Sequence, residues 1–482
     1  MLRSAGFLFG LLNIDESDFG LIGKRILQGA LPFIDVVDIK PPLVYLAFIP
    51  TGLFGGISIL PMRVVGVLWV FATCLVVGRA ARVYAGRGLA EVAARWLVVL
   101  AGACEIPSVS SELLMNLPAA GALFFFVRAE SGGGLTDVAL SGVCIGLASL
   151  FRHQAGILLA ALGLALCVRA TKRRDWRELS RPAVLAAGFA LPWVTAIAFY
   201  AGAGHFAEFY EWVIARNFFY ATGSSGLPFM RAMGAILLCV GAVAFPWALA
   251  TQESLRPLVR NGARLGLVLS LWLTWIAVSL GGRFYEHYFL QFVPLLALLA
   301  APRTAMLLEA WPRLRRRARV GLAAVATLPT LGLLGYSLAR GAAGNYPSQD
   351  PRAREIANWL KHNTTVDERV FIWGHFSPIY FLADRMPGTR YLTTSVHVGN
   401  FDPAYLADGV DLTPYCSDKD VALTLRDLEV NRVPVFIDTA PSGIHHWDRV
   451  PLSVVPAISR YLAAHYTLRA EVAGARIYRR TE

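Results

Sequence analysis

Long apolar runs alternate with short polar connections over the first 340 residues of this 482-residue chain. A run of about 17 to 22 apolar residues is long enough to cross a hydrocarbon core of about 30 Å as a helix. We therefore expect eleven membrane helices, near residues 1–14, 61–79, 93–109, 112–128, 136–151, 154–170, 183–203, 229–249, 264–281, 287–302 and 319–338. The first of these is short, because fourteen helical residues rise only about 21 Å.

The pattern changes at about residue 345, where polar residues become frequent and helical and strand periods alternate. Asp350 is suited to cap a helix and Pro351 to begin it, and the helix would continue through the sequence DPRAREIANWLKHN. RVFIWG, VPVFID and ARIYRR are typical of strands, and helical patterns lie between them. We predict a small α/β domain over residues 345–482, after a membrane domain over residues 1–340.

The composition agrees with a polytopic membrane protein, since 56% of the residues are hydrophobic and only 16% are charged. The net charge of +12 does not indicate nucleic-acid binding, because the cations concentrate in every second connection. The connections at 79–95, 128–136, 169–182, 251–264 and 303–319 contain 20 Lys or Arg residues. By the positive-inside rule these five are cytoplasmic, and the alternate connections and the C-terminal domain are external.

This topology makes residues 43–60 a helix at the external membrane surface, because a further crossing there would invert the arginine-rich loops. The charged stretch IDESDFGLIGKRILQGALPFIDVVDIKPPLVYL at residues 14–46 is then external too, within a loop over residues 15–60. Asp15 and Glu16 directly follow the predicted first helix. A partly desolvated carboxylate at the interface is suited to act as a general base. The alternative is that both acids only end a membrane helix in the headgroup region.

Lys40 is notable because the chain contains 40 Arg but only 5 Lys. Pro41 and Pro42 restrict the backbone that follows it. A compact ammonium held near the interface is suited to contact a phosphate. The alternative is a lysine that extends along the apolar surface to reach the headgroups.

Further ionisable residues collect at the external ends of the predicted helices. They are Glu105, Glu112, Arg152 and, within the sequence RFYEHY, Arg283 and His287. Ionisable groups at membrane depth are costly and usually face a cavity or a partner. The sequence RFYEHYF also fits an interfacial aromatic belt. Several predicted helices lack ionisable residues in their middle, which disfavours a pump or a coupled transporter.

The order of Asp15-Glu16, ILQG, FIDVVD and KPPLVY resembles the first external loop of GT-C-fold glycosyltransferases. These are the dolichyl-phosphate-mannose protein mannosyltransferase and lipid A aminoarabinose transferase superfamily, also known as glycosyltransferase family 39. The segments SSELLMNLPAAG, FRHQAG, GGRFYEHYFLQFVP and VFIWGHFSPIYFLADRMPGTRY are similar too. The resemblance extends over about residues 1–395 and is specific for the superfamily, not for its substrate.

The resemblance implies an inverting glycosyltransferase that takes a sugar from a polyprenyl-phosphate donor. The acceptor would be an envelope glycan, lipid or protein, and the site would lie on the external face of the membrane. The heavy use of Arg in the composition is compatible with a bacterial inner membrane. The implied catalytic residues are Asp15 as base, Glu16 beside it and Glu112 as a second acid. The implied phosphate-binding residues are Lys40, Arg283, His287 and Arg152.

No cofactor is expected, while dependence on a divalent metal stays open. His445, His446 and Asp448 could bind a metal, but such residues in a polar external loop are more often solvated. Two alternative functions also stay open. One is a polymerase or ligase of lipid-linked oligosaccharides, and the other is a non-catalytic carrier or flippase of polyprenyl-phosphate sugars.

Overall fold

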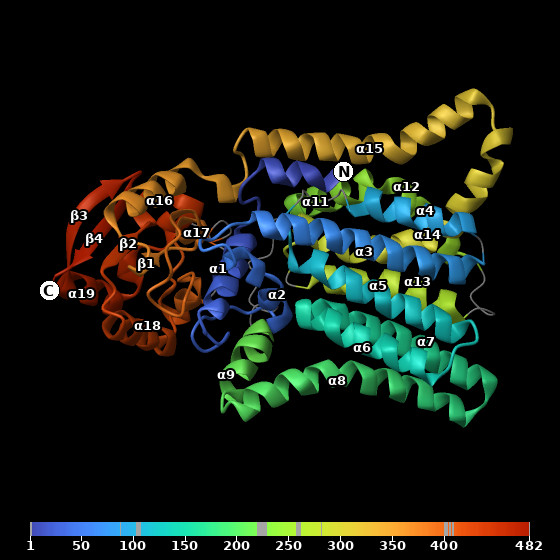
Figure 1. The fold of residues 1–482 in the computed structure, drawn as a ribbon, viewed down its shortest axis with the longest axis horizontal. Helices are drawn as coiled ribbons and strands as arrows, with labels where there is room; N and C mark the ends of the chain where they lie inside the picture. The colour runs from blue at the N-terminus through green and yellow to red at the C-terminus, as the bar shows by residue number, and fades with distance from the viewer. Residues whose placement is uncertain are drawn as a thin grey trace.

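A bundle of long helices meets a compact α/β domain at one end of the molecule (Figure 1). The computed structural model describes residues 2–86, 88–102, 108–218, 229–256, 262–280, 282–399, 403, 406 and 409–481. Residues 14–52 form short helices between the bundle and the α/β domain (Figure 1). These are α1 (Ile14–Leu27), α2 (Pro42–Ala47) and the 3₁₀ turn η2 (Ile49–Gly52).

The bundle is built from helices whose apolar residues face both one another and the outside. Their bounds are α3 (Leu60–Ala85), α4 (Gly88–Ala101), α5 (Ser111–Glu130), α6 (Leu135–Phe151), α7 (Ile157–Arg173), α8 (Ser180–Gly202), α11 (Phe229–Ala242), α12 (Ala244–Ser254), α13 (Gly262–Ser279), α14 (Val293–Ala310) and α15 (Arg316–Ala342). Short helical turns join some of them: η4 (His153–Gly156), α9 (Phe206–Tyr210), the π-turn η6 (Glu211–Ala215) and η7 (Glu286–Phe292).

The described residues contain seven helices that are long and apolar enough to cross a membrane. The pair α11 and α12, bent by 84°, makes an eighth candidate span, and α6 is a shorter apolar helix. A multi-pass membrane architecture is therefore confirmed, but the predicted count of eleven crossings is not. The predicted helix at 93–109 is observed as α4, which ends at Ala101, and Glu105 lies outside the described residues.

The predicted first membrane helix over residues 1–14 is wrong. Residues Leu2–Leu8 form only a short 3₁₀ helix, and α1 begins at Ile14. Asn13 caps α1, because its side-chain oxygen accepts the backbone N–H of Asp15. Acidic residues in a first turn are stabilised by the helix dipole. Asp15 and Glu16 therefore begin one helix rather than end another.

The single surface helix predicted over residues 43–60 is also interrupted. It consists of α2 and η2 followed by an irregular segment up to Leu60. Pro50 cannot donate the backbone hydrogen bond that a continuous helix needs at its position, and Gly52 is a weak helix former. The shortness of these turns keeps the preceding loop close to the ends of the bundle.

The α/β domain contains a four-stranded sheet with strand order β1-β2-β4-β3. Its helices are α16 (Pro351–Asn363), α17 (Pro378–Ala383), α18 (Asp418–Val430) and α19 (Pro456–His465). Its strands are β1 (Val370–Trp373), β2 (Val435–Asp438), β3 (Tyr466–Val472) and β4 (Ala475–Arg480). Strand β2 pairs with β1 in parallel and with β4 in antiparallel orientation, and β3 forms a hairpin with β4. Asp350 caps α16 as predicted.

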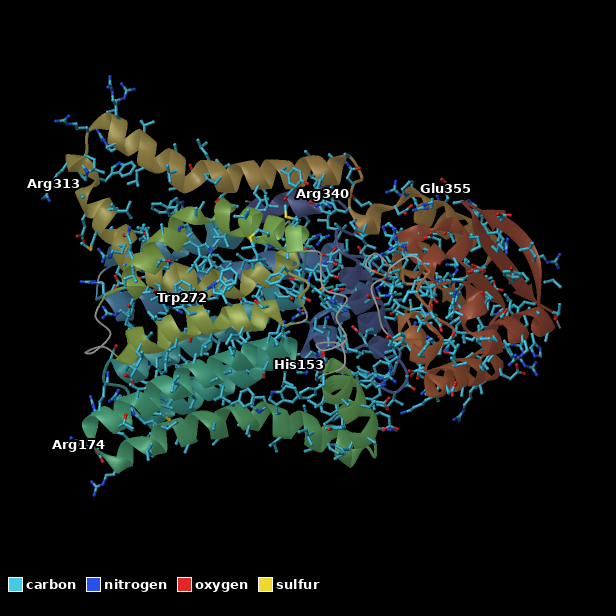
Figure 2. The ribbon with its side chains drawn as sticks, turned by 180° about the vertical axis from the view of Figure 1, so that it is seen from behind. His153, Arg174, Trp272, Arg313, Arg340 and Glu355 are labelled. Carbon is cyan, nitrogen blue, oxygen red and sulfur yellow. The ribbon has the colours of Figure 1, made fainter. Side chains whose placement is uncertain are left out.

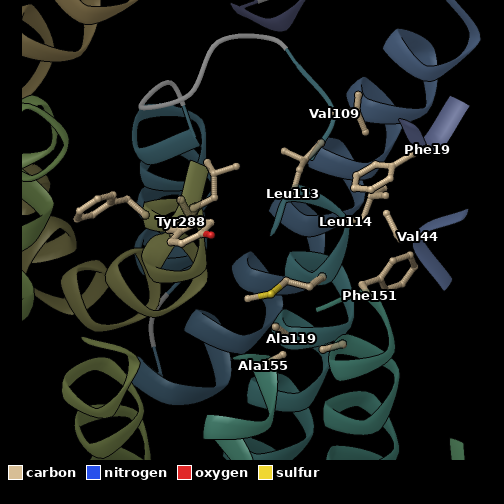
Figure 3. Close-up of a cluster of buried hydrophobic side chains, with 14 of the residues drawn as sticks. Phe19, Val44, Val109, Leu113, Leu114, Ala119, Phe151, Ala155 and Tyr288 are labelled. Carbon is tan, nitrogen blue, oxygen red and sulfur yellow. The ribbon is translucent and has the colours of Figure 1, made fainter. Parts of the chain in front are cut away.

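Buried apolar side chains attach the segment between bundle and sheet to the bundle. Figure 3 shows Phe19 of α1 and Val44 of α2 beside Val109, which precedes α5, and Leu114 in the first turn of α5. The four side chains are buried, so the position of α1 is determined by packing against the bundle. Residues of α1 are thereby fixed at the end of the bundle that faces the sheet.

The two ends of the bundle differ in charge. Arg174 and Arg313, from two arginine-rich connections, lie at the end far from the sheet, whereas His153 and Arg340 lie at the end near it (Figure 2). The far end also contains buried acids that pair with arginines, such as Glu130 with Arg169. Among the labelled side chains, His153 and Arg340 therefore share one end of the bundle with the sheet domain.

Candidate active site

A cavity of about 1050 Å³ lies where the bundle, the segment 14–52 and the α/β domain meet. Several distant parts of the chain line it, and three of them contribute ionisable residues as follows. Asp15 and Lys40 come from the N-terminal segment, Arg283 and His287 from the connection after α13, and His375 from the α/β domain. The site is therefore a product of the tertiary fold, because no single segment supplies more than part of its wall.

Asp15 and Asp18 face the cavity from α1. They are three residues apart, so they share one face of the helix. Asp38, on the loop after α1, lines the cavity as well. Burial, followed by the charge of Asp38, raises the pKa of Asp18 well above its ordinary value. Burial also raises the pKa of Asp38, against the opposing effect of Lys40.

Glu16 is the neighbour of Asp15 but lies on the other side of α1. It is completely buried and accepts hydrogen bonds from Leu12 N–H at 3.0 Å and from Val109 N–H at 2.8 Å. Its carboxylate also forms an ion pair with Arg63, with a second contact between Nη2 and Oε2 at 3.0 Å. Glu16 does not line the cavity, and its contacts tie α1 to α3.

Lys40 reaches the cavity from a loop with a restrained backbone. Its N–H donates to the hydroxyl oxygen of Tyr45 at 3.0 Å, and the Tyr45 hydroxyl lies 3.0 Å from its carbonyl oxygen. Tyr45 is fully buried, so this anchor is fixed. Pro41 is extended, with φ −65° and ψ 158°, and it leads directly into α2.

Arg152, Glu112 and His287 form a second polar group beside the first. Arg152 Nη2 lies 3.1 Å from Glu112 Oε1, and His287 Nε2 lies 3.9 Å from the same oxygen. The guanidinium of Arg152 also lies over the ring of Tyr288, 4.6 Å from its centroid. Arg152 and His287 line the cavity, while Glu112 is fully buried behind them. Glu112 thus pairs closely with Arg152 from behind the cavity wall, while His287 lies farther from its carboxylate.

Arg283 lies on a short irregular connection before η7. Gly282 and Phe284, on either side of it, both have positive φ, at 62° and 41°. A positive φ at Phe284 costs energy, because its side chain crowds the backbone in that conformation. Arg283 is nevertheless held at 8% exposure in the cavity wall. Such strain is most often retained at functional sites.

The α/β domain closes the opposite side of the cavity. His375 and His445 line it with ring centroids 5.3 Å apart. His445 and His446 have positive φ, at 52° and 59°. In the part of the chain that the structure describes, no group of three or more His, Cys, Asp or Glu side chains could hold a metal ion. His445, His446 and Asp448 are therefore not brought together as ligands.

No family model matches the chain, and no curated protein matches its sequence. Among solved structures, ArnT from Cupriavidus metallidurans, crystallised with undecaprenyl phosphate, is similar over 99% of this chain and 95% of its own. The TM-score is 0.63 at 16% sequence identity. The chain has the GT-C fold. Two structures of the oligosaccharyltransferase from Archaeoglobus fulgidus, one apo and one tethered to an acceptor peptide, share this fold with TM-scores of 0.54 and 0.55.

The oligosaccharyltransferase matches cover 98% of this chain, at 13% identity, and 70% to 71% of the archaeal chain. The GT-C fold expected from the loop at residues 14–46 is thereby confirmed for nearly the whole chain. The similarity covers the α/β domain as well as the bundle. It therefore extends beyond the segment in which the sequence pattern is strongest.

The GT-C cavity brings together most of the residues that the sequence analysis selected. Asp15, Lys40, Arg152, Arg283 and His287 all line it. Glu16 and Glu112 are buried outside it. Asp18 was not among the predicted site residues, although its spacing from Asp15 would have placed both on one face if residues 14–27 had been predicted as a helix. No local pattern marks His375 or His445 as a neighbour of α1.

Proposed function

We propose that this protein transfers a sugar from a polyprenyl-phosphate carrier to a hydroxyl group of an envelope glycan, lipid or protein. The observation that carries the proposal is the arrangement of charges in one cavity. Asp15 lines the cavity together with Lys40, Arg152 and Arg283, so a carboxylate and three cationic side chains face a shared space. The GT-C fold, and a relative of that fold crystallised with undecaprenyl phosphate, support this assignment.

The proposed reaction is a single displacement at the anomeric carbon. The acceptor oxygen forms a bond to this carbon as the bond to the phosphate oxygen breaks, and the electron pair of that bond remains on the lipid phosphate. Asp15 takes the proton from the acceptor hydroxyl. Lys40 and Arg283 stabilise the charge that develops on the departing phosphate. Attack from the face opposite the phosphate inverts the anomeric configuration.

Glu112 supports this reaction through Arg152 in the proposed mechanism. Because Glu112 is buried behind Arg152, it is not expected to touch the substrate. It instead keeps the guanidinium directed toward the cavity. Glu16 stabilises α1 through Arg63 and so keeps Asp15 in place. Both acids then act on the reaction through another residue.

The active site would face the external side of the cytoplasmic membrane. Arginine-rich connections lie at the end of the bundle opposite the cavity (Figure 2). Such connections are retained on the cytoplasmic side during insertion. The cavity and the α/β domain are then periplasmic, where a polyprenyl-phosphate sugar and an envelope acceptor would meet.

The proposal is tested by following a labelled sugar. The full chain is reconstituted in nanodiscs with undecaprenyl-phosphate sugars that carry a radiolabel, and a membrane extract of its host supplies acceptors. We expect label to move to an acceptor with native protein but not with Arg283→Ala, and the product to have the inverted anomeric configuration by NMR. Asp35→Asn is the control, because Asp35 is exposed on the loop that carries Asp38 and Lys40 and does not line the cavity.

Three results would contradict this proposal. Label that stays on undecaprenyl phosphate with every donor, while the folded protein still binds it, would favour the carrier alternative. Transfer that occurs only with an oligosaccharide already assembled on its lipid would favour the polymerase or ligase alternative. Transfer that Arg283→Ala leaves unchanged would place the reaction outside this cavity.

A further inference from the structure

The loop that carries Asp38 and Lys40 is held by residues from outside the N-terminal segment. Tyr45 anchors the backbone of Lys40 from within the segment. Two other contacts come from the connection after α9 and from the α/β domain, respectively. These contacts matter because Lys40 has a long flexible side chain, so the reach of its ammonium depends on where its backbone is fixed.

Asn217 provides the first outside contact. Its side-chain amide donates to the carbonyl oxygen of Ile39 at 2.7 Å. The same amide lies 3.0 Å from the carbonyl oxygen of Val213. Asn217 comes shortly after the π-turn η6, and π-turns are rare and frequently occur at functional sites. The contact is made on the carbonyl that belongs to the same peptide unit as the Lys40 N–H.

The α/β domain provides the second contact. The N–H of Val37 donates to the carbonyl oxygen of Arg390 at 3.0 Å, and Val37 pairs with Tyr391 as an isolated parallel bridge. The Arg390 side chain is held in turn by Asp427, with both guanidinium contacts at 2.9 Å. The loop is therefore attached at Val37, Ile39 and Lys40, over four consecutive residues.

The two outside contacts are joined behind the loop. Arg216, the residue before Asn217, contacts both carboxylate oxygens of Asp420 at 2.9 and 3.0 Å. Tyr391 donates its hydroxyl hydrogen to Asp420 Oδ1 at 2.8 Å. Asp420 is buried, and Arg216 also lies 3.9 Å above the ring of Trp212. A closed ring of contacts thus connects the loop, the connection after α9 and the α/β domain.

We infer that Asn217 is a positioning residue for Lys40. By fixing the Ile39 carbonyl it prevents rotation of the peptide that joins Ile39 to Lys40, and Arg216, Asp420 and Tyr391 brace it against the α/β domain. This inference rests on the proposed function, in which Lys40 binds the lipid phosphate. It adds that the membrane bundle and the α/β domain jointly set the position of the phosphate-binding cation.

The test uses equilibrium binding of radiolabelled undecaprenyl phosphate to the full chain in nanodiscs. Asn217→Ala removes the amide, and Asn217→Asp keeps its shape but removes its N–H donor. We expect each to raise the Kd about three- to tenfold, as loss of one hydrogen bond would. Asn363→Ala is the control, because Asn363 makes a similar amide contact to the Trp359 carbonyl oxygen, at 2.8 Å, on α16.

A double-mutant comparison separates positioning from general stabilisation. If Asn217 acts through Lys40, Asn217→Ala raises the Kd in the native background but not in the Lys40→Ala background. Equal losses in both backgrounds, or none in either, would overturn the inference while the proposed function stands. If the native protein binds no undecaprenyl phosphate, both the positioning role of Asn217 and the proposed function are overturned. The melting temperatures of the Asn217 variants and Asn363→Ala are measured in parallel, and only a Kd change that does not follow melting temperature supports positioning.

Discussion

Asp15 and Glu16 show how neighbouring carboxylates acquire different roles. Consecutive residues of a helix point about 100° apart, so α1 directs one acid into the cavity and the other into the bundle. Glu16 has every contact that a buried carboxylate needs, including Arg63 and two backbone N–H groups. Asp15 keeps access to the cavity. The difference follows from helix geometry and not from residue type.

Removing Glu16 is expected to destabilise the fold. Glu16→Ala leaves the buried guanidinium of Arg63 without its ion-pair partner, and such losses cost about 3 to 5 kcal/mol. Thermal unfolding in detergent measures the effect, with Asp35→Asn as control. The double variant Glu16→Gln/Arg63→Met should recover part of the loss. An unfolding free energy of Glu16→Ala within 1 kcal/mol of the native value would contradict the structural role assigned to this pair.

The raised pKa of Asp18 should make the stability of the fold depend on pH. Burial and the charges of Asp38 and Asp15 raise this pKa well above 3.8, so the folded protein binds the proton more tightly than the unfolded chain does. The ionised form therefore destabilises the fold above the raised pKa, and this penalty disappears as the pH falls below the ordinary value. Asp18→Asn removes the ionised form.

Asp18→Asn should accordingly raise the melting temperature at pH 8, and the gain should shrink toward zero as the pH approaches about 4. Melting curves of the native and variant proteins at several pH values measure this. A gain that grows on acidification would show the opposite linkage and would contradict the raised pKa. Any loss of transfer activity in the same variant would indicate that the unfavourable carboxylate is retained for function.

At the scale of elements, α1 is positioned by a close approach to the turn at residues 48–52. A Cβ atom on Gly23 would clash with the carbonyl group of Phe48, which is backbone and cannot rotate away. On the other side, α1 contacts the residues that flank α17, through an ion pair between Lys24 and Asp384, at 2.6 Å, and a hydrogen bond between Ser17 and Ser377, at 2.7 Å. The helix that carries Asp15 is therefore held from both sides.

Gly23→Ala is expected to move α1 and so to reduce both stability and transfer. Overpacking of this kind typically costs about 1 to 3 kcal/mol. Gly163→Ala is the matched control, because Gly163 lies within α7 and a Cβ there meets no atom within 4 Å. That control should be neutral or slightly stabilising, since Ala favours helix more than Gly does. If Gly23→Ala changed neither the free energy of unfolding nor the rate of transfer, the close approach of Gly23 to Phe48 would not position the site.

Elements with clear local signals could be predicted from the sequence. Asp350 followed by Pro351 predicted the start of α16, and the apolar sequences VFIW and VFID predicted β1 and β2. Strand β3 was missed because most of its side chains are exposed, so its sequence lacks a buried face. The start of α1 was missed because the apolar residues before Asn13 suggested a helix that ends there. The cap at Asn13 was the signal available to correct this.

At the scale of the whole molecule, the site depends on contacts that local patterns cannot reveal. The positions of Lys40 and Asp15 in one cavity could be predicted through the resemblance of their loop to a known family. The contacts of this loop with Asn217 and Tyr391 could not, because they join residues more than 170 positions apart and use backbone atoms of the loop that any residue possesses. The described residues of the bundle likewise gave fewer long apolar spans than the sequence suggested.

The role of Asp15 as the base is tested most directly by a single-turnover rate of sugar transfer. The protein is first bound to the polyprenyl-phosphate donor, and the rate is then compared between native protein and Asp15→Asn. A general base contributes about 10²- to 10⁴-fold to rate. We therefore predict that Asp15→Asn binds the donor as tightly as native protein but transfers the sugar slower by about that factor, whereas Asp35→Asn transfers it at the native rate. Transfer by Asp15→Asn at the native rate would contradict the assignment of Asp15 as the base.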